Sequence, residues 1–350
     1  MLVEPEDLTS AEVLAIVAEH WDAKARHCGF VPRGAGAQHW VVSGRHLPRW
    51  FVTADDVSAP GRLDELQDTY AAARALAGDG LVTVVPTVAP GGGGAGENVG
   101  GGGAGENVGG GGAGENVGGG GVGVVDGRWL LTVTPYVEGE WGPGDYADDA
   151  QRALVARALG ALHAAPPPAR IRSWEPGPPS RADLERVLET VDGPRWTSGP
   201  FGESVRIALQ DNAPELRSLL RRYDVLAAAA VRHRGDWVPT HGQPHTANVL
   251  WGEAGPLLVD WESLRVAPRE RDLRAVLRDA DGAEPLSAYV AMGGSLDLDA
   301  DRVELFDLEW WLGETAAYAV QFHAPHTGDT DEVRFHREFL EEVVPSTGGR

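Results

Sequence analysis

Side chains that can bind a metal ion gather in one short segment of the 350-residue chain. The segment runs from Thr240 to Glu262 and reads THGQPHTANVLWGEAGPLLVDWE. Transfer of a phosphoryl group from ATP requires an acceptor hydroxyl held in position, a divalent metal on the phosphates, and oxygen ligands for that metal. Asn248 supplies an amide oxygen, and Asp260 supplies a carboxylate at the end of an apolar run. A compact hairpin between them would bring these two ligands together.

The segment resembles the catalytic loop of the aminoglycoside phosphotransferase superfamily, to which choline and homoserine kinases also belong. The family pattern is HGDxHxxN, followed by an apolar strand that ends in (I/V)DW and by a later DL. This chain has HGQPHTAN, VDW and DL at those places, with Asp272 in the last of them. The segment is most similar to actinobacterial relatives that resemble spectinomycin phosphotransferase, some of which have HGEPHPGN in the loop.

The resemblance covers about residues 20–340, apart from a glycine-rich repeat. It implies an α+β, two-lobed protein-kinase-like fold, with an N-terminal antiparallel sheet lobe and a larger helical C-terminal lobe. The nucleotide-binding lobe would span residues 1–139, and residues 140–350 would carry the catalytic loop and the acceptor region. The implied cofactors are ATP and Mg²⁺, with Asn248 and Asp260 as metal ligands.

Three polar residues around the loop have roles that the resemblance also implies. His241 would orient the loop through main-chain hydrogen bonds, with a direct part in the chemistry as the alternative. His245 is expected to be packed and hydrogen-bonded, although a histidine at this place can also titrate near neutral pH. Asp272 is expected to brace the catalytic loop.

The nucleotide site is implied by three other stretches. RGAGAQHW resembles the nucleotide loop of the family, so Gly34 and Gly36 are expected to bind the cofactor. PYVEG resembles the hinge between the lobes, which places Tyr136 at the nucleotide. The strand that carries the phosphate-binding lysine in the family has Thr53 at about that place.

Gln243 is the first departure from the family pattern, because it stands where the catalytic carboxylate belongs. An amide accepts a hydrogen bond from a hydroxyl but cannot take its proton. General-base catalysis is worth about 10²–10⁴-fold in rate. The sequence therefore predicts weak turnover, with His245 and Glu262 as the residues that would have to act as a base instead.

Thr53 is the second departure, because it removes the lysine that grips the phosphates. Lys24 is the one lysine in the chain and lies upstream in a helix-like segment, so it is a poor substitute. Arg33 and Arg49 are the candidate replacements, but arginine and lysine are not interchangeable. Without the lysine, Glu65 is expected to be an ordinary solvated acid, and affinity for ATP is expected to fall.

The first 140 or so residues are predicted to form an antiparallel sheet of about five strands plus a helix. A capping box of Thr9 and Glu12 begins an earlier helix that runs to about Arg26. Apolar spacing predicts the second helix over 63–76. The strands that the sequence suggests are 38–42, 49–53, 81–88 and 128–137.

Residues 91–121 read GGGGAGENV three times and then GGGG. A segment with so little to bury is expected to be a flexible loop, here an expanded turn between two strands. A calcium-binding nonapeptide repeat is the alternative. It fits poorly, because Asn replaces Asp, the aliphatic residue comes one place early, and three copies are few.

The second part of the chain is predicted to be mostly helical, with helices at 150–163, 180–191, 204–212, 214–232, 301–322 and 331–344. Ser180 and Asp183 would cap the second of these. The acceptor is expected near FDLEWWLGETAAY, where aromatic and acidic side chains can bind a cation. These are Glu309, Trp310, Trp311 and Glu314. The alternative places the aromatic residues in the core, which the apolar spacing of Leu305, Leu308, Leu312, Ala316 and Ala319 already defines, and the acids in solvent.

The formal net charge of −22 disfavours nucleic acid and anionic membranes as partners and favours a cationic small-molecule acceptor. The sequence contains no apolar run long enough for a transmembrane helix, and its acidic N-terminus does not resemble a signal peptide. Cys28 is the single cysteine, which excludes an internal disulfide and fits a packed thiol in a cytoplasmic protein. The oligomeric state cannot be read from the sequence.

Two hypotheses follow. The first is an ATP- and Mg²⁺-dependent O-phosphotransferase that acts on a small-molecule hydroxyl, with antibiotics among the candidate acceptors. The second is a catalytically inactive pseudokinase that binds a nucleotide or a small cationic ligand. Asn248 and Asp260 favour the first hypothesis, whereas Gln243 and Thr53 favour the second.

Overall fold

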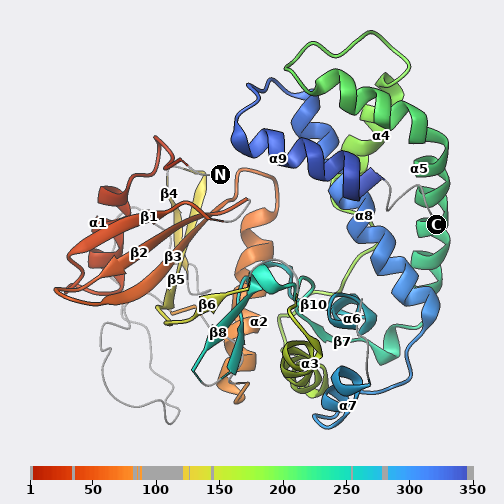
Figure 1. The fold of residues 1–350 in the computed structure, drawn as a ribbon. Coiled ribbons are helices and arrows are strands. Elements are labelled where there is room, and N and C mark those ends of the chain that lie inside the picture. The colour runs from red at the N-terminus through yellow and green to blue at the C-terminus, as the bar shows by residue number, and fades with distance from the viewer. Residues whose placement is uncertain are drawn as a thin grey trace. The chain divides into compact units, whose positions relative to one another are not determined.

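The computed structural model of the chain describes residues 3–33, 36–81, 85, 87–88, 121–125, 127–142, 146–253, 255–277 and 283–344 (Figure 1). The chain divides into two compact units. The first comprises the described parts of residues 1–172, 239–266 and 279–294, and the second those of 173–238, 267–278 and 295–350. The glycine-rich repeat up to residue 120, half of the expected strand 81–88, and Gly34 lie outside the described residues.

A five-stranded antiparallel sheet is the largest sheet of the first unit, and it confirms the predicted antiparallel sheet. Its strand order is β1-β2-β3-β5-β4. The strands are β1 (His27–Val31), β2 (Gln38–Ser43), β3 (Pro48–Asp56), β4 (Gly121–Val125) and β5 (Trp129–Pro135). The sequence patterns did not predict β1, whose five residues HCGFV show no clear alternation of buried and exposed side chains.

Two helices cover opposite faces of this sheet, because successive side chains of a strand point to opposite sides. Leu131 of β5 packs into the core shared with α1 (Ser10–His20). Its neighbour Leu130 packs against Leu66 and Tyr70 of α2 (Arg62–Gly78). The capping box predicted at the start of α1 is present, but the helix ends at His20 and not near Arg26.

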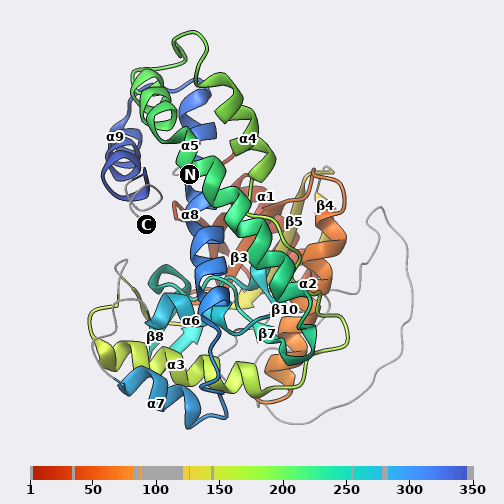
Figure 2. The same ribbon diagram turned by 90° about the vertical axis from the view of Figure 1, so that its right-hand side faces the viewer.

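A smaller three-stranded sheet of the first unit, in the order β6-β8-β9, consists of β6 (Glu140–Trp141), β8 (Val249–Gly252) and β9 (Gly255–Leu258). The same unit contains α3 (Asp149–Ala164) and α7 (Glu284–Val290), which lie side by side in Figures 1 and 2. Gly160 permits this close packing, because a Cβ atom there would lie 2.4 Å from the main-chain oxygen of Tyr289. His163 and Tyr289 also hydrogen-bond at 2.8 Å.

The second unit is helical, as predicted for the C-terminal part of the chain. It contains α4 (Arg181–Thr190), α5 (Gly202–Val231), α6 (Glu270–Leu277), α8 (Ala300–His323) and α9 (Thr330–Glu338), which continues into a π-helical turn to Val343. Its core forms where α4, α5 and α6 pack on α8. Figure 2 shows α5 and α8 running along each other.

Two predictions for this unit were wrong. The helices expected at 204–212 and 214–232 are one helix, α5, with Pro214 inside it. Proline removes one main-chain hydrogen bond, but Leu209 and Leu216 are both buried on either side of it, so packing keeps the helix continuous. Ser180 is the N-cap of α4, yet its side chain makes no capping hydrogen bond because its backbone is left-handed.

Within the part of the chain that the structure describes, no helix combines the length and the hydropathy needed to cross a membrane.

Candidate active site

The β8–β9 hairpin positions the two residues expected to bind the metal. Val249 pairs with Leu258 in its register, so Asn248 and Asp260 follow from the same end of the hairpin. The main-chain N–H of Val259 donates to the main-chain oxygen of Asn248 at 3.1 Å. The main-chain pairing of this hairpin therefore brings the positions of the predicted amide and carboxylate ligands close together.

Asn248 is buried and ends a 3₁₀ turn that begins at Thr246. Its amide nitrogen donates to the main-chain oxygen of Gln243 at 3.1 Å and lies 3.4 Å from Nε2 of His245. With the nitrogen turned toward the loop, the amide oxygen is the atom that can accept a cation.

Asp260 has a left-handed backbone, with φ of 63° and ψ of 67°. This conformation is uncommon for residues with a Cβ atom, although Asp and Asn adopt it more readily than most. The Asp260 side chain reaches solvent, but protein atoms surround much of its carboxyl group. This burial raises the pKa of Asp260 to about 7, and the charge of Glu262 acts in the same direction.

His241 is fully buried and connects the loop to the strand that ends at Asp260. Its Nε2 atom lies 2.8 Å from the main-chain oxygen of Val259, and its Nδ1 atom accepts from the main-chain N–H of Gln243 at 3.3 Å. These two bonds require the proton to be on Nε2. The ring also meets the edge of Trp261, with centroids 4.6 Å apart.

Two contacts from the segment before α3 hold the other side of the loop. The Tyr146 hydroxyl donates to the main-chain oxygen of Pro244 at 2.5 Å. Gly142 packs directly on Thr246, where a Cβ atom at position 142 would lie 2.6 Å from both Cβ and the main-chain oxygen of Thr246. The loop that carries Gln243 and Asn248 is thus held by contacts on both sides.

A network of charged side chains lies next to this loop. Arg62, at the first position of α2, contacts Glu262 and also pairs with Glu65 at 3.2 Å. Arg265 contacts the other oxygen of Glu65 and donates to Thr69 at 3.0 Å. The prediction that Glu65 is an ordinary solvated acid was therefore wrong, because two arginines bind it.

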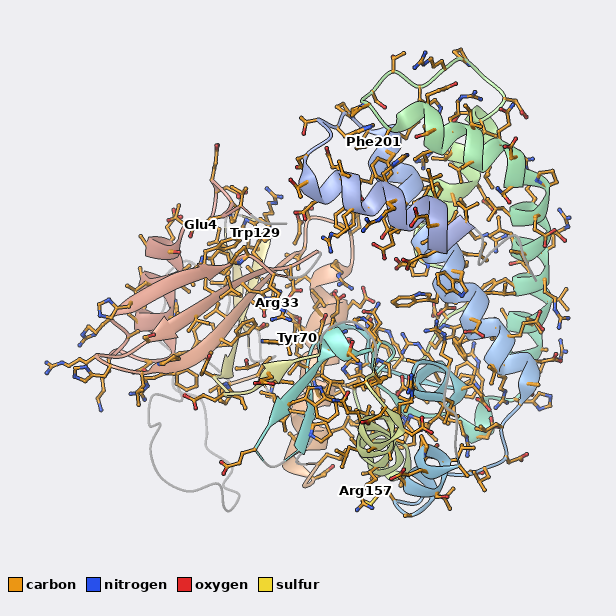
Figure 3. All side chains as sticks on the ribbon, viewed as in Figure 1. Glu4, Arg33, Tyr70, Trp129, Arg157 and Phe201 are labelled. Atoms are coloured by element: carbon orange, nitrogen blue, oxygen red, sulfur yellow. The ribbon has the colours of Figure 1, made fainter. Side chains whose placement is uncertain are left out.

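Asp55 is the buried acid of the same neighbourhood. It lies two residues after Thr53 on the same face of β3, and it accepts a hydrogen bond of 2.8 Å from the Tyr70 hydroxyl (Tyr70 is labelled in Figure 3). Burial raises the pKa of Asp55 to about 7, and the charges of Glu262 and Asp260 add to this effect. Asp55, Glu262 and Asp260 are therefore near one another.

The sequence of the chain matches the phosphotransferase enzyme family over residues 27–306. The chain belongs to this family. Protein StrN from Streptomyces griseus is 32% identical over 211 residues, which cover 58% of this chain and 61% of StrN. The match to StrN thus spans less than two thirds of that relative's length.

Solved structures of phosphotransferases share the fold. A spectinomycin phosphotransferase in complex with ADP and spectinomycin has a TM-score of 0.71 at 13% identity, with 98% of each chain covered. An amicoumacin kinase in complex with AMP-PNP and Ca²⁺ has a TM-score of 0.55 at 14% identity, with 97% of this chain and 95% of that chain covered. The resemblance noted from the HG…H..N…DW segment and the predicted kinase-like fold are confirmed.

Thr53, which is expected at the position of the family's lysine, forms a neutral pair with His39. The Thr53 hydroxyl lies 3.2 Å from Nδ1 of His39, its cross-strand partner on β2. The His39 ring stacks on Phe51 with centroids 5.2 Å apart. Burial lowers the pKa of His39 to about 4, with a further contribution from Arg33, so His39 is neutral at pH 7.

The other residues expected at the nucleotide have few contacts that define a role. Gly36 has φ of 106° and open space around it. The Tyr136 side chain is exposed, and its main-chain N–H donates to the oxygen of Arg49 at 2.9 Å. Arg33 (labelled in Figure 3) stacks on Trp141 at 4.2 Å.

Two candidate phosphate-binding cations have other surroundings. Arg49 pairs with Asp22 at 3.0 Å, and Asp22 also accepts from the indole of Trp50. Lys24 is exposed in the turn after α1, where its charge acts on Asp22. Both cations are therefore associated with Asp22.

In the second unit, Glu309 of α8 is an internal residue. It accepts hydrogen bonds from Trp174 Nε1 at 3.1 Å and from the Tyr223 hydroxyl at 2.6 Å. Burial raises its pKa. Trp310 lies under the guanidinium of Arg274 at 5.1 Å. The alternative that the acids of this helix face solvent is wrong for Glu309, whereas the predicted apolar core face of α8 is buried throughout.

Among the residues that the structure describes, no group of three or more His, Cys, Asp or Glu side chains is arranged to hold a metal ion. Mg²⁺ is often bound by one or two carboxylates together with water and substrate phosphates. Asn248 and Asp260 fit this kind of site, because the hydrogen bond of the Asn248 amide nitrogen leaves its oxygen for a cation and the Asp260 carboxylate reaches solvent. The sequence did not identify Asp55, Arg62 and Arg265 as part of the site. For Asp55, the available signal was an acid near the end of a buried strand.

Proposed function

We propose that this protein transfers the γ-phosphoryl group of ATP to a hydroxyl group of a small molecule, with Mg²⁺ as cofactor. The arrangement of Asn248 and Asp260 at one end of the β8–β9 hairpin supports this most directly. The hydrogen bond from Asn248 to the main chain of Gln243 fixes the amide so that oxygen, the ligand type Mg²⁺ prefers, points away from the loop. When bound, Mg²⁺ would neutralise charge on the phosphates during transfer.

Gln243 would hold the acceptor hydroxyl without removing its proton. In the transfer, the acceptor oxygen forms a bond to the γ-phosphorus, and the bond from that phosphorus to the oxygen that leaves with ADP breaks. The hydroxyl proton then goes to water, because an amide does not take it up. Weak turnover is the expected consequence, since a missing general base lowers the rate by about 10²–10⁴-fold.

The acceptor that we propose is a cationic small molecule with a free hydroxyl, such as an aminoglycoside or aminocyclitol antibiotic. The net charge of −22 favours association with cations. The names of two proteins with the same fold, a spectinomycin phosphotransferase and an amicoumacin kinase, support a small-molecule acceptor. We also propose a cytoplasmic location, which fits a reaction that consumes ATP.

The test is ATP turnover with Mg²⁺ and a panel of aminoglycosides and aminocyclitols. We expect slow formation of ADP together with a product that is heavier by one phosphoryl group in mass spectrometry. Binding of Mg²⁺-ATP without product from any acceptor of the panel would count against this function.

The second candidate is an inactive pseudokinase that binds a nucleotide or a small cation, and Gln243 and Thr53 are the observations that favour it. Thermal unfolding with ATP and increasing Mg²⁺ tests whether the protein binds a nucleotide, and the turnover measurement above separates the two candidates. A ligand that binds the folded state stabilises it by RT ln(1 + [L]/Kd). A melting temperature that does not change at millimolar ATP would argue against nucleotide binding, and thus against the first candidate and against the nucleotide-binding form of the second.

A further inference from the structure

Among the described residues, the face of β3 that should present a cation to the phosphates carries none next to Thr53, although the charge of Arg33 acts on the neighbouring His39 from the segment after β1. The cross-strand partners of Thr53 are His39, which is neutral at pH 7, and Thr132. The next residue on this face is Asp55, about 7 Å further along the strand. A cation for the phosphates must therefore come from another element.

Arg62 brings a cation to the same neighbourhood from the start of α2. It contacts Glu262, which lies two residues after Asp260, and its charge acts on both Asp55 and Asp260. Its side chain is 29% exposed, so it is held in place but still reaches solvent. A guanidinium group has five N–H donors, and within the described residues two of them have carboxylate partners.

Arg265 is the other arginine of the network, and its contacts indicate a structural role. Its side chain is 14% exposed. It contacts Glu65, donates to the Thr69 hydroxyl at 3.0 Å, and donates to the main-chain oxygen of Leu264 at 2.7 Å. Arg265 therefore connects Glu65 of α2 to the turn at Leu264. Of the two arginines, Arg62 is the more accessible to solvent.

We propose that Arg62 binds the phosphates of the nucleotide in place of the missing strand lysine. Glu65, whose counterpart in kinases pairs with that lysine, pairs with Arg62 through one oxygen and with Arg265 through the other. This inference rests on the proposed function, because it requires that the protein bind a nucleotide.

The acidic residues around Arg62 affect which form of the nucleotide can bind. Asp55, Asp260 and Glu262 are near Arg62, and together they oppose the approach of free phosphate groups. A nucleotide that carries Mg²⁺ brings compensating charge, whereas a nucleotide without a metal does not. Arg62 is therefore expected to act on Mg²⁺-nucleotide complexes, and its contribution is expected to grow with the number of phosphates.

The experiment measures, by isothermal titration with Mg²⁺ present, the affinity of wild type and Arg62→Gln for adenosine, AMP, ADP and ATP, and for the guanosine series. We expect Arg62→Gln to bind ADP and ATP about 10- to 100-fold more weakly, the loss that removal of a charge-assisted hydrogen bond produces. Affinity for the nucleosides should change less than twofold. Arg62→Lys, which keeps the charge, should recover part of the loss.

Two matched variants serve as controls. Arg74→Gln removes the same charge from the same helix, where Arg74 instead donates to Thr87 at 3.0 Å, and it should bind all nucleotides like wild type. Arg33→Gln tests the other arginine of the nucleotide region. Melting temperatures of all variants show whether they are folded, and Arg62→Met, which also removes the charge, carries the test if Arg62→Gln is not.

The outcomes separate this inference from the proposed function. A phosphate-dependent loss in Arg62→Gln, with Arg74→Gln unchanged, supports it. Equal ADP and ATP affinity in wild type and folded Arg62 variants, or a phosphate-dependent loss in Arg33→Gln alone, overturns it while nucleotide binding stands. Failure of wild type to bind any nucleotide overturns both.

Discussion

Nδ2 of Asn248 lies 3.1 Å from the main-chain oxygen of Gln243, so the residue that we propose as a metal ligand also fixes the residue at the base position. The contact involves the main chain of Gln243 and not its side chain. The main-chain N–H of Gln243 also donates to the Nδ1 atom of His241. A substitution at position 243 can therefore change the chemistry of the side chain while the loop keeps its place.

Replacing Gln243 by Glu should raise turnover of an accepted substrate by about 10²-fold or more, because a carboxylate of the same length can take the hydroxyl proton. Gln243→Asp, the residue of the family pattern, should act in the same direction. Nucleotide affinity should stay within about twofold of wild type. Steady-state kinetics with the best acceptor of the panel provides the measurement. Equal rates in all three proteins would mean that the proton leaves by a route that does not involve position 243.

Asp260→Asn should remove most of the dependence of nucleotide binding on Mg²⁺, since it deletes the carboxylate and keeps a side chain that tolerates the left-handed backbone. We expect ATP affinity in the presence of Mg²⁺ to fall at least about tenfold, in line with the loss of one charged partner. This Mg²⁺ dependence is measured from the melting temperature as Mg²⁺ is titrated at a fixed concentration of ATP. Glu253→Gln is the control, because it removes an equal charge from the exposed turn of the same hairpin. Similar Mg²⁺ curves for the two variants would contradict the assignment.

Gly142→Ala should impair activity from outside the loop. The added Cβ would lie 2.6 Å from Thr246, which begins the turn that carries Asn248. Because main-chain atoms must move to accommodate it, we expect a loss of about 1–3 kcal/mol in the free energy of unfolding, as for overpacked sites, and a parallel loss of turnover. Gly29→Ala has open space around its Cβ and should change neither quantity. Denaturant unfolding and turnover of both variants test this, and an unaffected Gly142→Ala would show that the loop can shift at no cost.

The pH dependence of stability should contain a contribution from Asp55. Its pKa is about 7 in the folded protein and 3.8 as its ordinary value, so the folded state binds this proton more tightly than the unfolded state. Its stabilising contribution is therefore full below about pH 3.8 and is lost as the pH rises through 7. Asp55→Asn should become more stable than wild type between pH 4 and 8, by on the order of a few kcal/mol.

Asp56→Asn is the matched control for this pH effect. Hydrogen bonds from Ser58 and the nearby Arg128 lower the pKa of Asp56 to about 2. The contribution of Asp56 is therefore present above its ordinary pKa and is lost as the pH falls toward 2, the opposite trend. Denaturant unfolding from pH 4 to 8 should show a growing advantage for Asp55→Asn and none for Asp56→Asn. Parallel pH curves for Asp55→Asn and wild type would mean that Asp55 is ionised at little cost in the folded protein.

Features that depend on neighbours in sequence were predictable. Local spacing predicts the capping box of Thr9 and Glu12 and a helix over residues 63–76, and the structure contains the box and a helix over 62–78. Pro214 misled the prediction of α5, because the propensity of one residue was outweighed by the burial of leucines on both sides of it.

The charged part of the candidate site could not be predicted in the same way. Arg62 and Glu262 are 200 positions apart in the sequence, as are Glu65 and Arg265. Motif spacing locates Asn248 and Asp260 because a hairpin joins them. It gives no information on which side chain of α2 comes near that hairpin, and so Glu65 was expected in solvent and Arg62 was not considered.

The left-handed backbone at Asp260 also limits how this position can change during evolution. Side chains branched at Cβ are poorly tolerated at φ of 63°, so the replacements compatible with the fold are chiefly Asn and Gly. Each of these keeps the hairpin and abolishes the negative charge. A lineage that no longer needed catalysis would therefore be able to lose the proposed metal ligand in a single substitution while the protein remained folded.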